Sequence, residues 1–151
     1  MSLIEKPYLL GRSFVFSITK GEDLLPLLTD FCKENQIKFG IITAAIGAVN
    51  KATFGIYDQK NKKYNKITME KELEILSLQG NISIYEHKPM IHAHITLSDS
   101  SGNSFGGHLM SPTIVFSCEI MIQELTGSEP KTRKSDKSVE LLLWPNPLSQ
   151  K

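Results

Sequence analysis

Residues 91–97 read IHAHITL, and the rest of the predicted fold is built outward from this stretch. Apolar residues hold every odd position, while His92, His94 and Thr96 hold the even positions. Side chains of a β-strand point alternately to opposite faces, so the alternation predicts a strand with one face toward a core and both imidazoles on the other. The two histidines would lie about 7 Å apart along the strand, a spacing at which an H-x-H pair can hold one metal ion.

The residues that follow predict a β-hairpin that returns a third histidine to the first two. A polar stretch, SDSSGN at 98–103, separates the strand from a second short segment, FGGHLM. If the loop holds five residues, Ser98 pairs with Ser104, and His94 pairs with His108 on the same face. A slip of one residue would turn His108 to the opposite face, and the two glycines before it allow a bulge. The pattern alone therefore leaves the position of His108 open.

Three neutral imidazoles with an open fourth position are typical of catalytic rather than structural zinc sites, because structural sites usually close with cysteines. Zinc is the first candidate, followed by other divalent first-row metals. The same pattern also fits surface or hydrogen-bonded histidines that bind no metal. The fourth histidine, His87, precedes Lys88 and Pro89 and is expected in a turn.

Three other residues, Glu119, Arg12 and Glu74, are candidates for catalytic roles. Glu119 lies on the more polar face of an expected strand at 113–125, where it could serve as an acid, a base, a fourth ligand or a partner of a ligand. A surface or salt-bridged carboxylate is the alternative. Glu74 and Arg12 have similar standing, and an ion pair between them would satisfy both.

The remaining pattern predicts one domain of α/β type, more narrowly α+β. A chain of 151 residues matches the usual size of a single domain. Alternation and helical periodicity predict a βαβ-like start, with a strand at 12–19, an amphipathic helix at 24–35 and a buried strand at 39–45. A hairpin of 52–57 with 66–70 is expected next, followed by strands at 73–78 and 113–125. Gly80 and Asn81 are expected to mark a break after the strand at 73–78. The core would span about 12–125, followed by a polar loop at 126–138 and a final strand at 139–144.

Composition limits the partners of the chain. Seventeen basic residues against sixteen acidic residues leave a net charge of +1, which provides no overall field for holding a polyanion such as DNA. The basic residues of the polar loop, which are Lys131, Arg133, Lys134 and Lys137, are expected to be solvated.

No apolar run approaches the roughly 20 residues that span a bilayer, and the first ten residues lack a secretory h-region. We therefore expect a cytoplasmic protein with no membrane contact. Cys32 and Cys118 are expected in the core.

Five motifs, in order along the chain, resemble the PPC domain shared by plants and prokaryotes. They are GEDLL at 21–25, IGAV at 46–49, LEILSLQGNIS at 73–83, IHAH at 91–94 and GGHL at 106–109. The resemblance covers about 12–125 and implies a compact domain with a mixed, largely antiparallel sheet and one main helix, usually assembled as a homotrimer.

The resemblance also bears on function. Plant members carry an AT-hook that contacts DNA, whereas this chain has no Arg-Gly-Arg-Pro hook, so that contact does not transfer. Where the family commonly shows GRFEIL, residues 71–76 read KELEIL, which puts any partner contact of the Gly-Arg pair in doubt. The fold looks similar to that of acetolactate decarboxylases, and by that analogy His92, His94 and His108 would hold a catalytic zinc that polarises a carbonyl or activates water.

Two hypotheses of different class follow. The first is a stand-alone, trimeric PPC-domain protein whose zinc site binds a small carbonyl or carboxylate ligand, acting as a metal-dependent lyase or hydrolase. The alternative is a DNA-binding or transcription-regulatory module that interacts with proteins and performs no catalysis.

Overall fold

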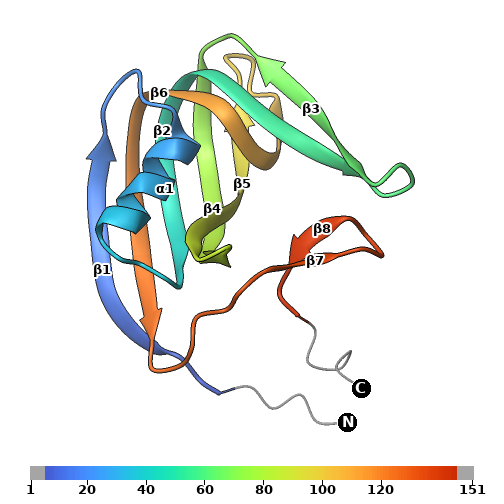
Figure 1. Cartoon of the computed structure of the whole chain (residues 1–151). Helices are drawn as coiled ribbons and strands as arrows, with labels where there is room; N and C mark the ends of the chain where they lie inside the picture. Colours follow the sequence, from blue (N-terminus) through green and yellow to red (C-terminus); the bar gives the residue numbers. More distant parts are fainter. Residues whose placement is uncertain (1–5, 146–151) are drawn as a thin grey trace.

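The structure is a computed structural model that describes residues 6–145 of the chain. It contains one helix and eight strands among these residues (Figure 1). Their bounds are β1 Leu9–Ile18, α1 Leu24–Glu34, β2 Gly40–Asp58, β3 Lys63–Met69, β4 Leu73–Tyr85, β5 Lys88–Ser98, β6 Ser104–Thr126, β7 Lys134–Asp136 and β8 Leu141–Leu143. The predicted α+β class with a largely antiparallel sheet and one main helix is confirmed.

Two long strands, β2 and β6, organise the sheet. β6 pairs with β1, β5 and β2, while β2 pairs with β3, β4 and β6, and β4 pairs with β5. The strands β2, β4, β5 and β6 therefore form a closed circuit from which β1 and β3 extend at the two sides. Figure 1 shows α1 packed against this curved sheet, with the β2–β3 hairpin projecting from it. Every ladder is antiparallel, and the described parallel contact is a single bridge between Ile84 and Thr132.

The core is built from the apolar face of each strand together with one stripe of the helix. In β5 the odd-numbered residues Ile91, Ala93, Ile95 and Leu97 are at most 6% exposed, as the alternation predicts. Leu24, Leu28 and Cys32, spaced by four residues on α1, are buried in the same cluster, and Cys118 is buried there as well. The inward face of β5 is thus held by the core, which leaves its histidines on the outward face. No helix in residues 6–145 has the length and apolar character needed to cross a bilayer.

Several predicted boundaries of strands and turns were wrong, because pairing between strands that are distant in the sequence decides them. The expected βαβ start forms only in a split arrangement: β1 and β2 run parallel and are joined through α1, but β6 lies between them and pairs antiparallel with both. β2 and β6 are each a single long strand, since register shifts let one strand bend where a turn was expected. No break occurs at Gly80, which lies within β4. A Cβ there would come 2.5 Å from the carbonyl oxygen of His92, so this glycine allows close strand approach and does not form a turn.

The polar segment after β6 is more ordered than its composition predicts. It carries the short strand β7, which pairs with β8. It also adds backbone hydrogen bonds to β4, from the Ile84 amide to the Lys131 carbonyl at 3.0 Å and from the Arg133 amide to the Ile84 carbonyl at 2.7 Å. These bonds attach residues 131–133 to the side of the sheet that carries the histidines.

Close approach between β5 and β6 depends on Gly106. A Cβ at this position would lie 2.0 Å from the carbonyl oxygen of Ile95, an atom of the facing backbone that cannot rotate away. Any side chain here must push β6 away from β5 next to His108.

We predict that Gly106→Ala lowers the free energy of unfolding by about 1–3 kcal/mol, the usual range for overpacking. Urea denaturation followed by circular dichroism would measure the loss, with Ser101→Ala in the exposed hairpin loop as a control that retains wild-type stability. Equal stability of Gly106→Ala and the wild type would contradict the close approach of the two strands.

Candidate metal centre

The β5–β6 hairpin has the five-residue register that brings the third histidine to the first two. Ser98 lies opposite Ser104, and His94 lies opposite His108. One nitrogen from each of His92, His94 and His108 lies within 4.8 Å of the corresponding nitrogen of the other two. His92 and His108 are half-buried and His94 is exposed, so the cluster is open to solvent on the His94 side. This arrangement can surround one metal ion with three imidazoles.

The ring of His108 is half-buried, and one of its two nitrogens lacks a hydrogen bond among the described residues. Its Nδ1 atom is buried and has no hydrogen-bond partner among the described residues. Leaving such an atom without a partner costs about 1–3 kcal/mol, which a bound ligand can offset. The ring stacks on Tyr64, with centroids 4.8 Å apart. Burial, followed by the nearby His92, His94 and Arg133, lowers the pKa of His108 to about 4, so the ring is neutral and keeps a lone pair at neutral pH.

His92 contacts a buried arginine. The Nη2 atom of Arg133 lies 3.2 Å from His92 Nδ1. A guanidinium can only donate, so the imidazole accepts this hydrogen bond at Nδ1 and carries its own proton on Nε2. Binding a metal through Nε2 would require that proton to move to Nδ1 and this hydrogen bond to break. Burial, the charge of Arg133 and the neighbouring His94 together lower the pKa of His92, which keeps this second ring neutral as well.

Arg133 is the residue of the centre that sequence reasoning missed. Its expected position in a solvated loop was wrong, because the side chain is only 5% exposed. It donates from Nε to Ser83 Oγ at 2.9 Å and from Nη2 to Asn81 Oδ1 at 2.7 Å, and Asn81 lies directly opposite His92 on the neighbouring strand. No local pattern distinguishes this arginine from the lysines around it. Tyr64 was also missed, although its place in the expected hairpin beside β2 provided a weak signal.

The structure places the three other candidates elsewhere. The alternative of an ion pair between Arg12 and Glu74 is wrong, because Arg12 donates from Nε and Nη2 to Glu124 at 2.7 and 2.8 Å. Glu119 is exposed on β6 and lies opposite Ile46. No contact joins any of the three to the histidine cluster within residues 6–145. Their catalytic roles remain predictions.

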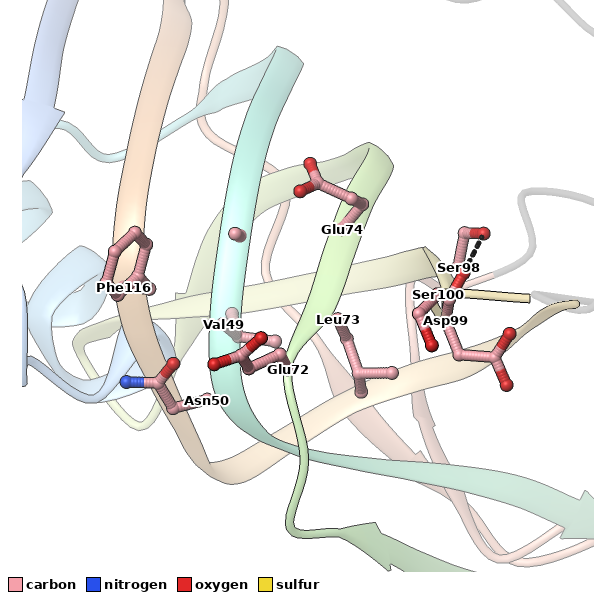
Figure 2. A pocket seen from close by; sticks show the side chains of 10 residues that line it. Val49, Asn50, Glu72, Leu73, Glu74, Ser98, Asp99, Ser100 and Phe116 are labelled. Carbon is pink, nitrogen blue, oxygen red and sulfur yellow. Dashed lines mark hydrogen bonds between the residues drawn. The ribbon is translucent and has the colours of Figure 1, made fainter. Parts of the chain in front are cut away.

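Glu74 lines a separate pocket of about 260 Å³ at the start of β4 (Figure 2). Its walls come from β2, β4, β6 and the β5–β6 loop, and they carry the carboxylates of Glu72, Glu74 and Asp99 but no histidine. The carboxylate of Asp99 already accepts hydrogen bonds from Lys71 and from the backbone of its own loop, so its partners lie within the protein. This pocket is therefore distinct from the histidine centre.

A closed antiparallel sheet with one helix and a three-histidine cluster on its outer face defines a small α+β domain with a candidate metal centre. The model of the Plants and Prokaryotes Conserved (PCC) domain matches residues 6–126, and the chain belongs to this family. This is the family whose motifs the sequence resembles.

Solved structures of the same architecture agree. A plant- and prokaryote-conserved (PPC) protein from Pyrococcus horikoshii is 35% identical, with a TM-score of 0.88 over 95% of this chain and 98% of that one. A protein from Archaeoglobus fulgidus described as metal-containing is 38% identical, with a TM-score of 0.87 over 97% of this chain and all of the other. A protein from Bacteroides thetaiotaomicron, provisionally described as DNA-binding, is 29% identical, with a TM-score of 0.81 over 91% and 96% of the two chains.

Curated relatives are much longer than this chain. A bifunctional protein GlmU from Synechococcus is 25% identical over 75% of this chain, and the match spans 17% of the relative's length. The similarity concerns one segment of that protein.

The depressed pKa of His108 predicts that the metal-free protein loses stability in acid. Above pH 6.5 the ring of His108 is neutral in both the folded and the unfolded state. Between pH 6.5 and about pH 4 the unfolded state binds a proton at this ring, whereas the folded state does not. Stability should therefore fall with decreasing pH across this window, by at most about 1.4 kcal/mol per pH unit for this residue, and by less because the ring retains some solvent contact.

Urea denaturation in the presence of a chelator, at pH values from 7.5 to 4, would measure the slope. His108→Phe keeps a ring to stack on Tyr64 but cannot titrate, so its slope should be shallower. Identical slopes for the two proteins would contradict the assignment to His108.

Proposed function

We propose that His92, His94 and His108 form a metal centre, with zinc as the first candidate and other divalent first-row metals behind it. The supporting observation is the meeting of three imidazole nitrogens within 4.8 Å of one another on one outward face. The orphaned Nδ1 of His108 and the lowered pKa of two of the rings suit a metal, because an imidazole binds metal only when neutral. A relative 38% identical to this chain is itself described as metal-containing.

We further propose that the centre acts on a small carbonyl or carboxylate ligand, as a lyase or a hydrolase. A divalent ion held by three imidazoles supplies a Lewis acid for a carbonyl oxygen or lowers the pKa of a water molecule. His94 is the exposed member of the set, so ligand would enter from its side, while Tyr64 stacks on His108 and limits access there. The similarity to acetolactate decarboxylases belongs to this proposal and stays a prediction.

Protein purified without an affinity tag should contain close to one metal ion per chain by elemental analysis. His92→Ala and His108→Ala should each reduce the metal content at least tenfold, because two imidazoles cannot replace a three-ligand set. His87→Ala removes an exposed histidine outside the cluster and should retain the metal. Absence of metal in the wild type, or equal content in all four proteins, would refute the centre.

We propose a homotrimer as the assembled form, with the copy number taken from the family resemblance. An apolar strip on the outward face supports self-association. It consists of Val15, Ile41, Ile46, Leu76 and Met121, which are between 37% and 71% exposed. These residues lie on the neighbouring strands β1, β2, β4 and β6, with Val15 opposite Met121. Exposed apolar side chains gathered on neighbouring strands are typical of a protein-interaction surface.

The double variant Ile46→Glu, Met121→Glu should shift the protein from trimer to monomer, because buried carboxylates in the interface would lack partners. Multi-angle light scattering would measure the mass of each form. Ile56→Glu changes an equally exposed isoleucine outside the strip, on the β2–β3 hairpin, and should remain trimeric. A monomeric wild type, or a trimeric double variant, would rule out this interface.

The DNA-binding or regulatory module without catalysis is the second candidate function. It is favoured by the provisional description of the Bacteroides relative, while the net charge of +1 speaks against it. Retardation of duplex DNA that weakens steeply with salt would support this candidate, since phosphate contacts release counterions.

A further inference from the structure

Among residues 6–145, the buried guanidinium of Arg133 has no carboxylate partner. Its hydrogen bonds run to neutral acceptors, which are Ser83 Oγ, Asn81 Oδ1, the Leu142 carbonyl oxygen and His92 Nδ1. None of the ion pairs in residues 6–145 includes it. The ring of Trp144 lies 5.3 Å from the guanidinium carbon and offers a cation–π contact. These contacts engage four of the five N–H groups, but they leave the charge itself uncompensated.

An uncompensated buried charge is costly, and proteins rarely retain one without a function. Here the charge lies directly beside a proposed metal ligand, since Arg133 Nη2 is 3.2 Å from His92 Nδ1. The neighbouring groups whose charge lowers the pKa of His92 and His108 are other histidines and Arg133, and none of these groups is a carboxylate. A divalent ion bound here would therefore add positive charge to a site that already carries one and, in the part of the chain that the structure describes, has no negative group acting on these two rings.

We infer that the ligand of this centre is a small carboxylate and that Arg133 is the residue that selects its charge. The inference rests on the proposed metal centre. A carboxylate would neutralise the combined positive charge, whereas a neutral carbonyl compound would leave it in place. Because four of the five N–H groups of Arg133 are engaged within the protein, it acts on the ligand mainly through its charge, as a positioning residue.

This role of Arg133 predicts opposite effects of its removal on anion binding and on metal binding. Removing its charge should weaken binding of an anion to the metal-loaded protein. The same change should leave metal affinity unchanged or raise it, because the metal no longer meets a neighbouring cation. A glutamine at this position can also accept a hydrogen bond from His92 Nδ1, which suits the tautomer of a metal-binding imidazole. A merely structural role would instead weaken both kinds of binding.

The test uses the full chain loaded with cobalt(II), whose visible spectrum reports changes in coordination. Acetate is titrated as the charged probe and acetamide as its neutral counterpart, and metal affinity is measured by chelator competition. Arg133→Gln should weaken acetate binding about tenfold, leave acetamide binding unchanged, and bind metal at least as tightly as the wild type. Arg133→Lys keeps the charge and should lose less acetate affinity. Lys134→Gln removes one charge from an exposed neighbour and should behave as wild type.

Trp144 provides an internal control for folding, since it is the only tryptophan of the chain and contacts Arg133. Wild-type fluorescence of Arg133→Lys would show that the segment remains docked in the variant that keeps the charge. Joint loss of metal and acetate affinity in both Arg133 variants, or unchanged acetate affinity in Arg133→Gln, would overturn the role of Arg133 but leave the metal centre standing. Failure of the wild type to bind cobalt would overturn both proposals.

Discussion

The antiparallel register between β5 and β6 is the constraint on which the candidate centre depends. His94 and His108 face each other across this pair, and a slip of one residue would send His108 toward the core. The register is held by a five-residue loop whose backbone is bonded to Asp99 and by the close approach of the strands at Gly106. The apolar face of β5 adds to this restraint, because shifting it would expose four core residues.

β6 performs a second task, because it also pairs with β2 and so closes the sheet. Gly55 of β2 lies opposite His108, and its lack of a side chain leaves room for Tyr64 and Met110. The third histidine therefore sits where three strands meet, supported by backbone on two sides. A ligand set on paired strands is more rigid than one on loops, which favours a preformed site.

Burial gives the centre its electrostatic character. It keeps His92 and His108 neutral, and the guanidinium of Arg133 reinforces this effect on both rings. The same guanidinium opposes the binding of a cation. A metal and an anion that bind together resolve this conflict, since each reduces the unfavourable field experienced by the other. The attachment of residues 131–133 to β4 thus places the charge of Arg133 beside the candidate centre.

The sequence by itself determined the outward face of β5, a helix at about 24–35 and a hairpin with a short loop that could bring His108 to His94. These features depend on local periodicity and turn chemistry, which neighbouring residues specify. Only the tertiary structure decided that one register is adopted, that β1 and β2 both flank β6, and that Arg12 pairs with Glu124 and not with Glu74. It also decided that Arg133 is buried beside His92, 41 residues away in the chain. Contacts between such distant residues depend on how the sheet closes, and no local pattern contains that information.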